Sequence, residues 1–521
     1  LLPIKESFDL LGLGLLFIIL TGVYLVLSSV FEYWRLRHIP GPPLAAWTNL
    51  WLMRNMNGKE KFYDVRKRLH QKYGPVQRYG PNRVMFSDVS AVHSVLPTSN
   101  ILPKGLCMDR NVHGLSESLI DLSQADSYAP LKASVNGTEV ASFLAITDDD
   151  RAARLKRFLH PTFSPNGVLR YESHVDHTVS EMVTHLRNVG PTVDLAPWFG
   201  WFAFDTITRI GFSEDQGFMR EQGDIAGAGK AAQQRFAHWI FYWTIPWLET
   251  TLHKNWYVKH RKSTTQSGLA KLATRVVNSR KAKGGLGTHH DLLDLYMESG
   301  KQDPQLYTPS TILGLTMTTI HAGAETTAYT SAICMYCILS DRRVHDKLRE
   351  ELESVLPKAE ADWELPDTST LRKLPYLEAC IKESARLKPS NNIMAERVVN
   401  TDNAIIAGVS IPRGTIVAMN TAGLNTDQSI WGADIEVFRP ERWLEASEEQ
   451  RVLMHRANLT FSAGKRICLG MNIAWMEMKK VIPALIMNFD LVHPEDDLKQ
   501  TSGVFGVPEE IQVYIRPRVK T

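Results

Sequence analysis

The sequence predicts a mainly α-helical fold with small β-sheets, preceded by an N-terminal transmembrane helix. Three observations support this fold class. An uncharged run of 21 residues covers positions 10–30. Long segments with helical periodicity follow, such as 344–355 and 376–387, whereas strand-like runs such as 411–419 and 511–515 are short. We therefore expect helices to form the framework and strands to add only minor sheets.

The uncharged run at 10–30 has the length of a membrane anchor. At a rise of about 1.5 Å per residue it can cross a hydrocarbon core of about 30 Å. The flanking charges are Lys5, Glu6 and Asp9 before the run and Glu32, Arg35 and Arg37 after it. The positive excess on the C-terminal side predicts that the body of the protein faces the cytosol. A buried core helix is the alternative, but the run lacks an amphipathic pattern.

Directly after the anchor, the segment Pro40-Gly41-Pro42-Pro43 cannot continue a helix and favours a stiff, extended connection. We find no repeat of fixed period and no second linker as clear as this one. The sequence therefore predicts a membrane anchor at 1–38, a proline-rich hinge at 39–43 and one large catalytic domain at 44–521.

The composition excludes several classes of protein. Lys and Arg total 59 against 56 for Asp and Glu, a net charge of +3 without a block of like charges, so a dedicated nucleic-acid binder is not expected. Five scattered cysteines are too few for a disulfide framework in a chain of this length, and they predict a reducing compartment. These cysteines are Cys107, Cys334, Cys337, Cys380 and Cys468.

The clearest chemical motif is Phe461-Ser-Ala-Gly464-Lys-Arg466-Ile-Cys468-Leu-Gly470, followed by a helical stretch at 471–489. Cys468 opens that helix, where free N–H groups and the helix dipole favour the thiolate that a metal needs. The two glycines remove side chains where the backbone turns sharply or approaches a flat ligand. Arg466 offers a fork for a carboxylate such as a haem propionate, and Phe461 could shield the sulfur. Together they describe a cradle for haem iron; the alternative is a buried, inert cysteine.

A second motif lies in a long, mostly apolar segment at 310–339. Seven of the twenty positions 311–330 are threonine and Glu325 would sit at mid-span, so a helix through the protein core fits better than a second membrane span. Within it, Ala322-Gly323-Ala324-Glu325-Thr326-Thr327 places small residues beside an acid and an alcohol, which leaves space over a cofactor face. The alternative is a Thr326 hydroxyl bonded back to its own helix, with Glu325 satisfied by a neighbouring base. His321 either points into the same cavity or packs as a neutral side chain.

The cysteine segment resembles the cysteine loop of the cytochrome P450 family of haem-thiolate monooxygenases, and the 322–327 segment resembles the oxygen-binding helix of that family. The resemblance implies a cytochrome P450 fold and haem b with its iron ligated by the Cys468 thiolate. It also implies that Thr326 hydrogen-bonds dioxygen and that Glu325 relays protons from water, so that the O–O bond cleaves heterolytically. Phe461, Gly464, Arg466 and Gly470 are then cofactor-binding residues.

Glu383 and Arg386 lie three residues apart on one predicted helix face and can pair. Glu448 and Arg451 have the same spacing, so the pattern alone is weak. The segment 438–443 resembles the family segment whose arginine completes a buried network of three charges with such a pair. That network is expected to be structural, and the loss of Glu383 is expected to strand two arginines.

Two further positions are compared with the propionate-binding residues of the family. Arg397, in Glu396-Arg397-Val398, matches one of them. Before Pro161-Thr162-Phe163-Ser164 the family usually has Trp or His and then Arg four residues later, whereas this chain has Ala152 and Lys156. Lys156 can contact a propionate as a point charge, with Arg157 as a substitute, but the bidentate geometry of arginine is lost.

The resemblance implies a monooxygenase that inserts one atom of dioxygen into a lipophilic small molecule. The sequence is similar to those of filamentous-fungal microsomal members of the family, including the pisatin demethylase type. This similarity suggests a role in secondary-metabolite biosynthesis or detoxification. It also suggests that the protein lies at the endoplasmic reticulum membrane, which it crosses once. An NADPH-dependent cytochrome reductase is the expected electron donor, docking near Lys465, Lys479 and Lys480. By analogy, substrate contacts are expected around 105–142, 318–322, 391–394 and 504–505. The alternatives are an isomerase, dehydratase or peroxygenase of the same fold, or a non-enzymatic haem sensor or carrier.

Three other motifs are expected to be structural. Cys334-Met-Tyr-Cys337 has redox-motif spacing but lies inside the long helix. The segment 227–230 imitates a phosphate loop without its first glycine and its hydroxyl residue. His289-His290-Asp291 is expected to lie in a solvated loop before a helix.

Overall fold

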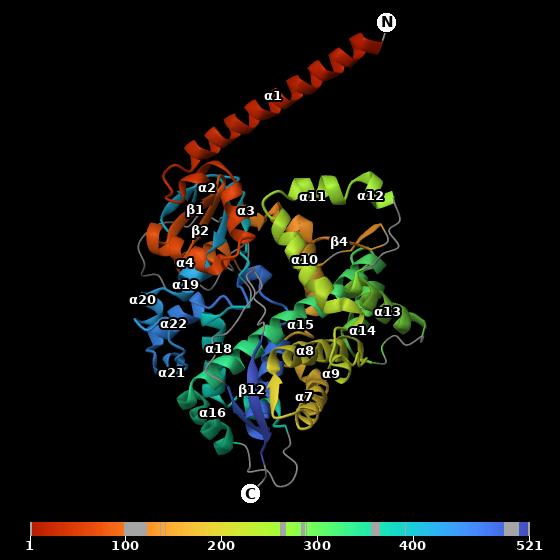
Figure 1. Cartoon of the computed structure of the whole chain (residues 1–521), viewed down its shortest axis with the longest axis vertical. Coiled ribbons are helices and arrows are strands. Elements are labelled where there is room, and N and C mark those ends of the chain that lie inside the picture. Colours follow the sequence, from red (N-terminus) through yellow and green to blue (C-terminus); the bar gives the residue numbers. More distant parts are fainter. Residues whose placement is uncertain are drawn as a thin grey trace.

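The computed structural model describes residues 3–97, 122–135, 137–140, 142–260, 267–282, 287, 289–355, 365–390, 392–493 and 510–518. Helices dominate these residues, as the sequence predicts, and the strands form small sheets. The body tapers between two ends: α1 projects from one end, and the C-terminus lies at the other (Figure 1).

The helices of the N-terminal half are α1 (Pro3–Arg35), α2 (Pro43–Trp47), α3 (Leu50–Met56), α4 (Phe62–Tyr73), α5 (Ala91–Val95), η1 (Asp126–Leu131), α6 (Asp149–Leu159), η2 (Gly167–Tyr171), α7 (Glu172–Leu186), α8 (Leu195–Phe212), α9 (Phe218–Glu221), η3 (Ile225–Gly227), α10 (Ala228–Tyr242), α11 (Pro246–His253) and α12 (Trp256–His260). Those of the C-terminal half are α13 (Gly268–Ala282), α14 (Leu292–Gln302), α15 (Pro309–Ser340), α16 (Arg342–Val355), α17 (Thr368–Leu371), α18 (Pro375–Leu387), α19 (Thr421–Asn425), α20 (Gln428–Trp431), α21 (Arg442–Glu445), α22 (Glu448–Ala457), η4 (Gly464–Arg466) and α23 (Met471–Asn488).

The strands of the described residues form two larger sheets and two hairpins. In the larger sheet the order is β1 (Val76–Gly80), β2 (Arg83–Phe86), β10 (Ile416–Met419), β7 (Arg397–Val399) and β3 (Leu122–Gln124), and only β2 and β10 pair in parallel. A second sheet orders β11 (Phe489–Val492), β12 (Gln512–Pro517) and β6 (Thr192–Asp194). The hairpins are β4 (Ala133–Val135) with β5 (Thr138–Val140) and β8 (Ala404–Ile406) with β9 (Val409–Ile411).

The helices and strands named from sequence are confirmed with one correction. The segments 344–355 and 376–387 lie in helices α16 and α18, 471–489 is helix α23 except for Phe489, which begins β11, and 511–515 lies in β12 apart from its first residue. The run at 411–419 is not one strand, because it divides between β9 and β10. Gly414 between them has φ = 82°, a conformation that turns the chain and that residues with a Cβ rarely adopt.

Helix α15 is the central element of the body (Figure 1). It has 32 residues, about 48 Å of helix, and packs against α8, α13, α18 and α23. Pro309 at its first turn has no N–H to leave unpaired, and the Thr308 side chain accepts a hydrogen bond from the Thr311 N–H. The sequence prediction of a core helix over 310–339 is therefore confirmed.

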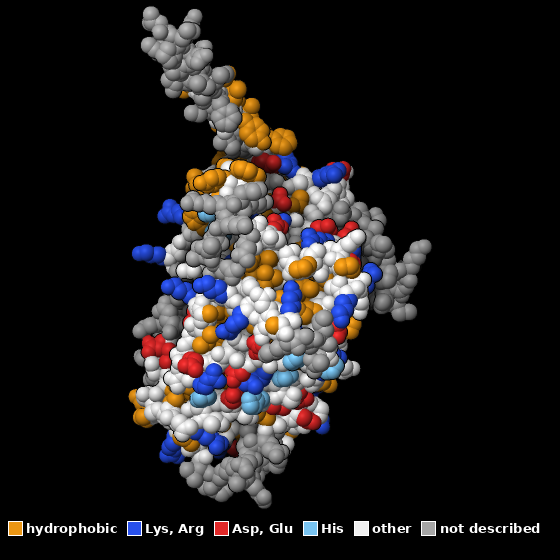
Figure 2. All heavy atoms as spheres, turned by 90° about the vertical axis from the view of Figure 1, so that its right-hand side faces the viewer, with side chains coloured by type: hydrophobic (Ala, Val, Ile, Leu, Met, Phe, Trp, Pro, Cys, Tyr) orange, Lys and Arg blue, Asp and Glu red, His pale blue; other side chains and the backbone are white. Residues whose placement is uncertain are grey.

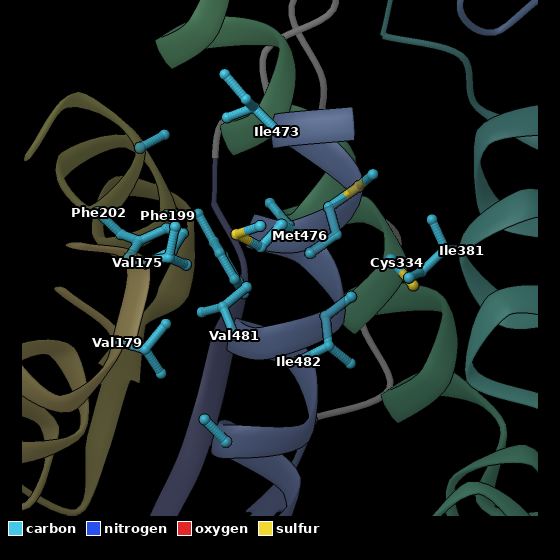
Figure 3. Packing of buried hydrophobic residues seen from close by; sticks show 14 of the residues in the cluster. Val175, Val179, Phe199, Phe202, Cys334, Ile381, Ile473, Met476, Val481 and Ile482 are labelled. Carbon is cyan, nitrogen blue, oxygen red and sulfur yellow. The ribbon is translucent and has the colours of Figure 1, made fainter. Parts of the chain in front are cut away.

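The largest hydrophobic cluster joins α7, α8, α15, α18 and α23. Figure 3 shows Val175 of α7 and Phe199 of α8 facing Val481 of α23, with Cys334 of α15 and Ile381 of α18 on the opposite side of that helix. All five side chains are fully buried or nearly so. This packing fixes α23, which begins three residues after Cys468, against the central helix.

The three motifs set aside as structural are structural. Cys334 and Cys337 are buried inside α15, and burial raises the pKa of the Cys337 thiol to about 12. At the false phosphate loop, the Asp224 carboxylate accepts hydrogen bonds from two backbone N–H groups at the start of α10. The backbone N–H groups of His289 and His290 donate to Asp294, in the first turn of α14. The expected solvated loop is wrong for Asp291, which caps α14, is 2% exposed and pairs with Arg280.

The expected transmembrane run lies within α1, which leaves the body as one long helix (Figure 1). Its described apolar side chains, among them Leu15, Ile19 and Leu27, are exposed (Figure 2). Within the ranges described above, no helix combines the length and the apolar character of a membrane span. The transmembrane helix is therefore not confirmed and stays a prediction.

The proline-rich segment after α1 is held against the first sheet. The Arg78 backbone N–H of β1 donates to the Pro40 carbonyl at 2.7 Å, and the Arg78 guanidinium donates to the carbonyls of Glu32 and Ala46 at 2.9 and 3.1 Å. A Cβ on Gly41 would lie 2.2 Å from the Arg78 carbonyl oxygen, so only glycine fits this approach. The end of α1 is thus tied to the body through Arg78.

The predicted network of three charges is confirmed. Glu383 is fully buried, and its carboxylate accepts hydrogen bonds from Arg386 at 2.8 and 3.0 Å, from Arg442 Nε at 2.7 Å and from Trp443 Nε1 at 3.0 Å. The two guanidinium groups also donate to backbone carbonyls of residues 425, 435 and 437. The network joins α18 to the segment before α22, whereas the Glu448 and Arg451 pair of equal spacing is exposed.

Glu477 of α23 is buried like Glu383, but its carboxyl group lacks the hydrogen-bond partners that Glu383 has. It is 1% exposed, and neither of its carboxylate oxygens has a hydrogen-bond partner. Burial alone raises its pKa well above the ordinary value, so the fold favours the protonated form of this side chain.

Replacing Glu383 with Ala is expected to destabilise the fold by about 3–5 kcal/mol, because two buried guanidinium groups lose their common partner. Glu448→Ala, which breaks an exposed pair of the same spacing, is the matched control and is expected to cost less than about 1 kcal/mol. The measurements are thermal unfolding and the haem content of purified protein. Normal haem content and stability in Glu383→Ala would contradict this role.

Replacing Glu477 with Gln is expected to stabilise the protein increasingly as pH rises. The unfolded chain releases the Glu477 proton above about pH 4.5 while the folded chain keeps it, so rising pH favours unfolding by up to about 1.4 kcal/mol per pH unit. The gain in Tm of Glu477→Gln over the parent should therefore be larger at about pH 7 than at about pH 5. The exposed Glu350→Gln is the control, and an equal gain at both pH values would refute the buried, protonated carboxyl.

Candidate functional site

The cysteine loop, residues 461–470, is fixed by backbone contacts before α23 begins. The Lys465 N–H donates to the Pro97 carbonyl at 2.9 Å, and the Cys468 N–H donates to the Phe461 carbonyl at 2.9 Å. Gly464 has φ = 68°, and a Cβ there would lie 2.3 Å from the Leu96 carbonyl oxygen. The expected role of Gly464 in a sharp turn and a close approach is thus visible in the backbone. A Cβ on Gly470 would meet no atom within 4 Å, so it faces open space.

The Cys468 side chain is accessible, whereas Cys334, Cys337 and Cys380 are buried. The sulfur accepts hydrogen bonds from the backbone N–H groups of Gly470 and Met471, at the start of α23. These donors and the Lys156 charge lower the pKa of the thiol, but the surrounding protein raises it more. The expected effect of the helix terminus is therefore confirmed in direction, since its N–H groups favour the thiolate, but burial of the sulfur opposes it and is the larger effect.

Lys156 of α6 contacts the cysteine loop directly. Its ammonium group donates to the carbonyls of Lys465 at 2.9 Å and Ile467 at 3.2 Å. Burial, assisted by the nearby charge of Arg466, lowers the Lys156 pKa to about 8. Arg157, the substitute considered from sequence, is exposed on another face of α6.

Arg466 and Arg397 lie within electrostatic reach of Lys156. Arg466 pairs with the Asp149 carboxylate, with Nε at 2.7 Å, and donates to the Ile146 carbonyl at 3.0 Å. Arg397 begins β7 and donates to the Glu396 carbonyl at 2.8 Å. The Glu396 carboxylate itself pairs with Arg83 of β2.

The charges around the loop leave two cations without an acidic partner. Asp149 balances Arg466 and Glu396 balances Arg83, whereas Lys156 and Arg397 form no ion pair among the described residues. Haem b carries two propionates, which two unpaired cations beside an accessible thiol would neutralise. The donor set therefore fits haem b, with Cys468 as iron ligand and Lys156 and Arg397 nearest to the carboxylates. Phe461 packs on the Trp475 ring at 6.1 Å, at the start of α23.

The small residues at the middle of α15 have different roles. Ala322 is exposed although the helix crosses the core, so this position opens a space beside the helix. Gly323 instead faces α8, where a Cβ would lie 2.5 Å from Ile207. The expectation that the small residues clear a cofactor face is thus wrong for Gly323, which allows two helices to pack closely, and for Ala324, which is fully buried; for the exposed Ala322 it stays a prediction.

Thr326 and Glu325 make the local contacts of the alternative interpretation, in which the Thr326 hydroxyl bonds to its own helix and Glu325 lies beside a base. The Thr326 hydroxyl donates to the Ala322 carbonyl at 2.8 Å, and the Glu325 carboxylate lies 3.5 Å from His321 Nε2. Both side chains are half-buried. His321 is 6% exposed and its ring lies 4.2 Å from the Phe236 ring, so it is a packed side chain, and burial lowers its pKa.

The expected reductase-docking lysines are not a surface patch. Lys480 is fully buried and pairs with Glu172 at 2.7 Å and with Asp176. Lys479 is 9% exposed and pairs with Glu378 at 2.7 Å. The docking site expected from sequence is therefore wrong at Lys479 and Lys480, because both ammonium groups form ion pairs within the fold; at the half-buried Lys465 it stays a prediction. The substrate-contact regions expected at 105–121, 391 and 504–505 lie outside the described residues.

Sequence reasoning did not identify Asp149 or Arg83 as parts of this site. Asp149 lies 317 positions before Arg466 in the chain, and Arg83 lies 313 positions before Glu396. One signal was available for Asp149, since it lies seven residues before Lys156, on the same predicted helix.

Comparison with known proteins identifies the family. A family model described as Cytochrome P450 matches residues 40–513. Cytochrome P450 monooxygenase mpaDE of Penicillium brevicompactum is 30% identical over 95% of this chain and 57% of its own length. A cytochrome P450 monooxygenase of Aspergillus terreus is 30% identical over 89% of this chain and 92% of its own length. Cytochrome P450 monooxygenase pkfB of Emericella nidulans is 29% identical over 95% of this chain and 94% of its own length. This chain thus spans a little over half of the first relative and nearly all of the other two.

Replacing Lys156 with Met is expected to weaken thiolate ligation, because the cysteine loop loses a clamp and the sulfur loses a nearby cation. The fraction of haem-loaded protein whose reduced carbon monoxide complex shows the thiolate-type absorption band should fall several-fold, and Lys156→Arg should retain more of it than Lys156→Met. Arg157→Met removes an adjacent but exposed charge and is the control. Equal spectra for Lys156→Met and Arg157→Met would show that Lys156 has no such role.

Proposed function

Because the chain belongs to the cytochrome P450 family, we propose that it is a haem-thiolate monooxygenase that inserts one atom of dioxygen into a lipophilic small molecule. One observation carries the proposal. The accessible Cys468 sulfur lies at the start of α23 and accepts hydrogen bonds from two backbone N–H groups, with Lys156 nearby and Arg397 within electrostatic reach of Lys156; neither cation has an acidic partner in the part of the chain that the structure describes. A buried, inert cysteine would need none of these features.

Haem, the cofactor of this family, supplies the redox chemistry that activates dioxygen. The residues of this chain hold and orient it. Cys468 ligates the iron, Lys156 and Arg397 neutralise the propionates, and Arg466 keeps the cysteine loop in place through Asp149. Gly470 and Ala322 leave open space on the loop and on α15.

Thr326 and Glu325 are proposed to manage the protons that dioxygen reduction consumes. The Thr326 hydroxyl donates to Ala322, so its oxygen keeps lone pairs that accept a hydrogen bond, and Glu325 is held close by through His321. Glu325 is half-buried and therefore accessible to water, as a group that passes protons inward must be.

The proposed setting is fungal secondary-metabolite biosynthesis or detoxification, with the enzyme attached to the endoplasmic reticulum membrane by α1 and its body in the cytosol. The fungal origin of the three relatives supports the first part, and the exposed apolar side chains of α1 support the second. An NADPH-dependent cytochrome reductase is the proposed electron donor. An isomerase, dehydratase or peroxygenase of the same fold, or a haem sensor, is disfavoured because none of them needs the acid and alcohol of Glu325 and Thr326.

Reduced protein is expected to give the thiolate-type carbon monoxide spectrum, and Cys468→Ser is expected to lose it. With reductase, NADPH and labelled dioxygen, one labelled atom should appear in the product.

Thr326→Ala should lower product per NADPH by roughly tenfold or more and raise peroxide release. The control is Thr330→Ala, one turn later on α15, which removes an equivalent hydroxyl-to-carbonyl bond of 2.8 Å. Unchanged coupling in Thr326→Ala would favour the alternatives.

A further inference from the structure

Tyr128 reaches the proposed haem site from a segment that lies far from the cysteine loop in sequence. It belongs to η1, which begins two residues after β3, and β3 pairs antiparallel with β7 so that Gln124 lies opposite Arg397. The contact continues beyond the strand, since the Ala125 N–H donates to the Glu396 carbonyl at 3.4 Å. The sheet therefore places η1 beside Arg397, the residue expected to bind a haem propionate.

The Tyr128 side chain has a fixed orientation. It is 3% exposed, and its ring centroid lies 5.5 Å from that of Trp239 in α10 and 5.6 Å from that of Trp243, directly after α10. Trp239 Nε1 donates to the Ser127 carbonyl at 2.8 Å, which fixes the preceding residue of η1 as well. The ring is thus held against α10, while the hydroxyl lies at the Met394 carbonyl, in the segment before β7.

The Tyr128 hydroxyl is only weakly paired by the part of the chain that the structure describes. It donates to the Met394 carbonyl at 3.4 Å, whereas O–H···O hydrogen bonds are usually about 2.7–2.8 Å long. Tyr79 of β1 shows the ordinary case, because its hydroxyl donates to the Glu396 carboxylate at 2.7 Å. A buried donor with so long a bond gains little from it, so a closer and stronger acceptor would be favoured.

Two arginines of the proposed haem site act on the same hydroxyl. Burial raises the pKa of Tyr128 and the Glu396 charge adds to this effect, whereas Arg397 and Arg466 lower it, Arg397 also through a hydrogen bond to the phenol oxygen. Besides burial, the same two arginines lower the pKa of Lys156. Tyr128 and Lys156 are therefore both close to this pair of guanidinium groups, at the place where the surplus positive charge of the site lies.

Helix α6 lacks two donors that the family resemblance implies for a propionate. Ala152 stands where Trp or His is usual, and it is 2% exposed and has no polar side-chain atom. Lys156 stands where Arg is usual, and its ammonium group already donates to two carbonyls of the cysteine loop. A propionate thus finds fewer free donors on α6, and the Tyr128 hydroxyl supplies one from η1 instead.

We propose that Tyr128 is a cofactor-binding residue whose hydroxyl donates a hydrogen bond to a haem propionate beside Arg397. This inference rests on the proposed haem-thiolate function and adds a residue to its cofactor site. A carboxylate is a stronger acceptor than the distant Met394 carbonyl, so the hydroxyl gains by the exchange. The phenol is protonated at neutral pH and therefore contributes a donor without adding a further charge.

The test uses Tyr128→Phe, which removes the hydroxyl and keeps the ring that packs on Trp239 and Trp243. Haem-loaded protein is mixed with excess apomyoglobin, and haem transfer is followed by absorbance. The variant is expected to lose haem about tenfold faster than the parent, as for the loss of one hydrogen bond to a charged group. When both proteins carry haem dimethyl ester, this difference should shrink to about twofold or less, because ester groups are uncharged and weaker acceptors.

Tyr376→Phe is the matched control, because it removes another buried tyrosine hydroxyl, which donates to Glu441 at 2.9 Å between α18 and α21. It should transfer haem at the parent rate. The inference is overturned if Tyr128→Phe keeps the parent rate, if Tyr376→Phe loses haem equally fast, or if the effect of Tyr128→Phe is undiminished with the dimethyl ester. The carbon monoxide spectrum of the parent preparation reports separately on the haem-thiolate function, and a missing thiolate-type band would refute that function itself.

Discussion

Charged groups inside this protein need partners, and this constraint organises the structure. The Glu383 carboxylate shows the fully compensated case, with two guanidinium groups and an indole N–H around it. The second guanidinium group, that of Arg442, also pairs with Asp434 at 3.0 Å, so the charges of the network balance and hold α18 against the segment before α22. Helix α18 in turn packs on α15 and α23, the two helices that frame the proposed haem site.

The cysteine loop shows the partly compensated case. Arg466 and Arg83 are balanced by Asp149 and Glu396, and they serve as fixed supports. Lys156 and Arg397 keep surplus positive charge beside a sulfur that the surrounding protein by itself keeps as a thiol. An iron porphyrin with two carboxylates resolves both imbalances at once, because the metal favours the thiolate and the propionates neutralise the cations.

The sequence by itself determined the helical framework and the core helix over 310–339, because these depend on periodicity. It determined the cysteine loop and the charge network of Glu383 through motifs that resemble those of the family, because local spacing alone was a weak signal for the network. Only the tertiary structure decided that Lys156 grips the carbonyls of Lys465 and Ile467, that Gly323 faces α8, and that Lys479 and Lys480 are buried. Whether a charge is compensated depends on groups brought together from distant parts of the chain, and no local pattern carries that information.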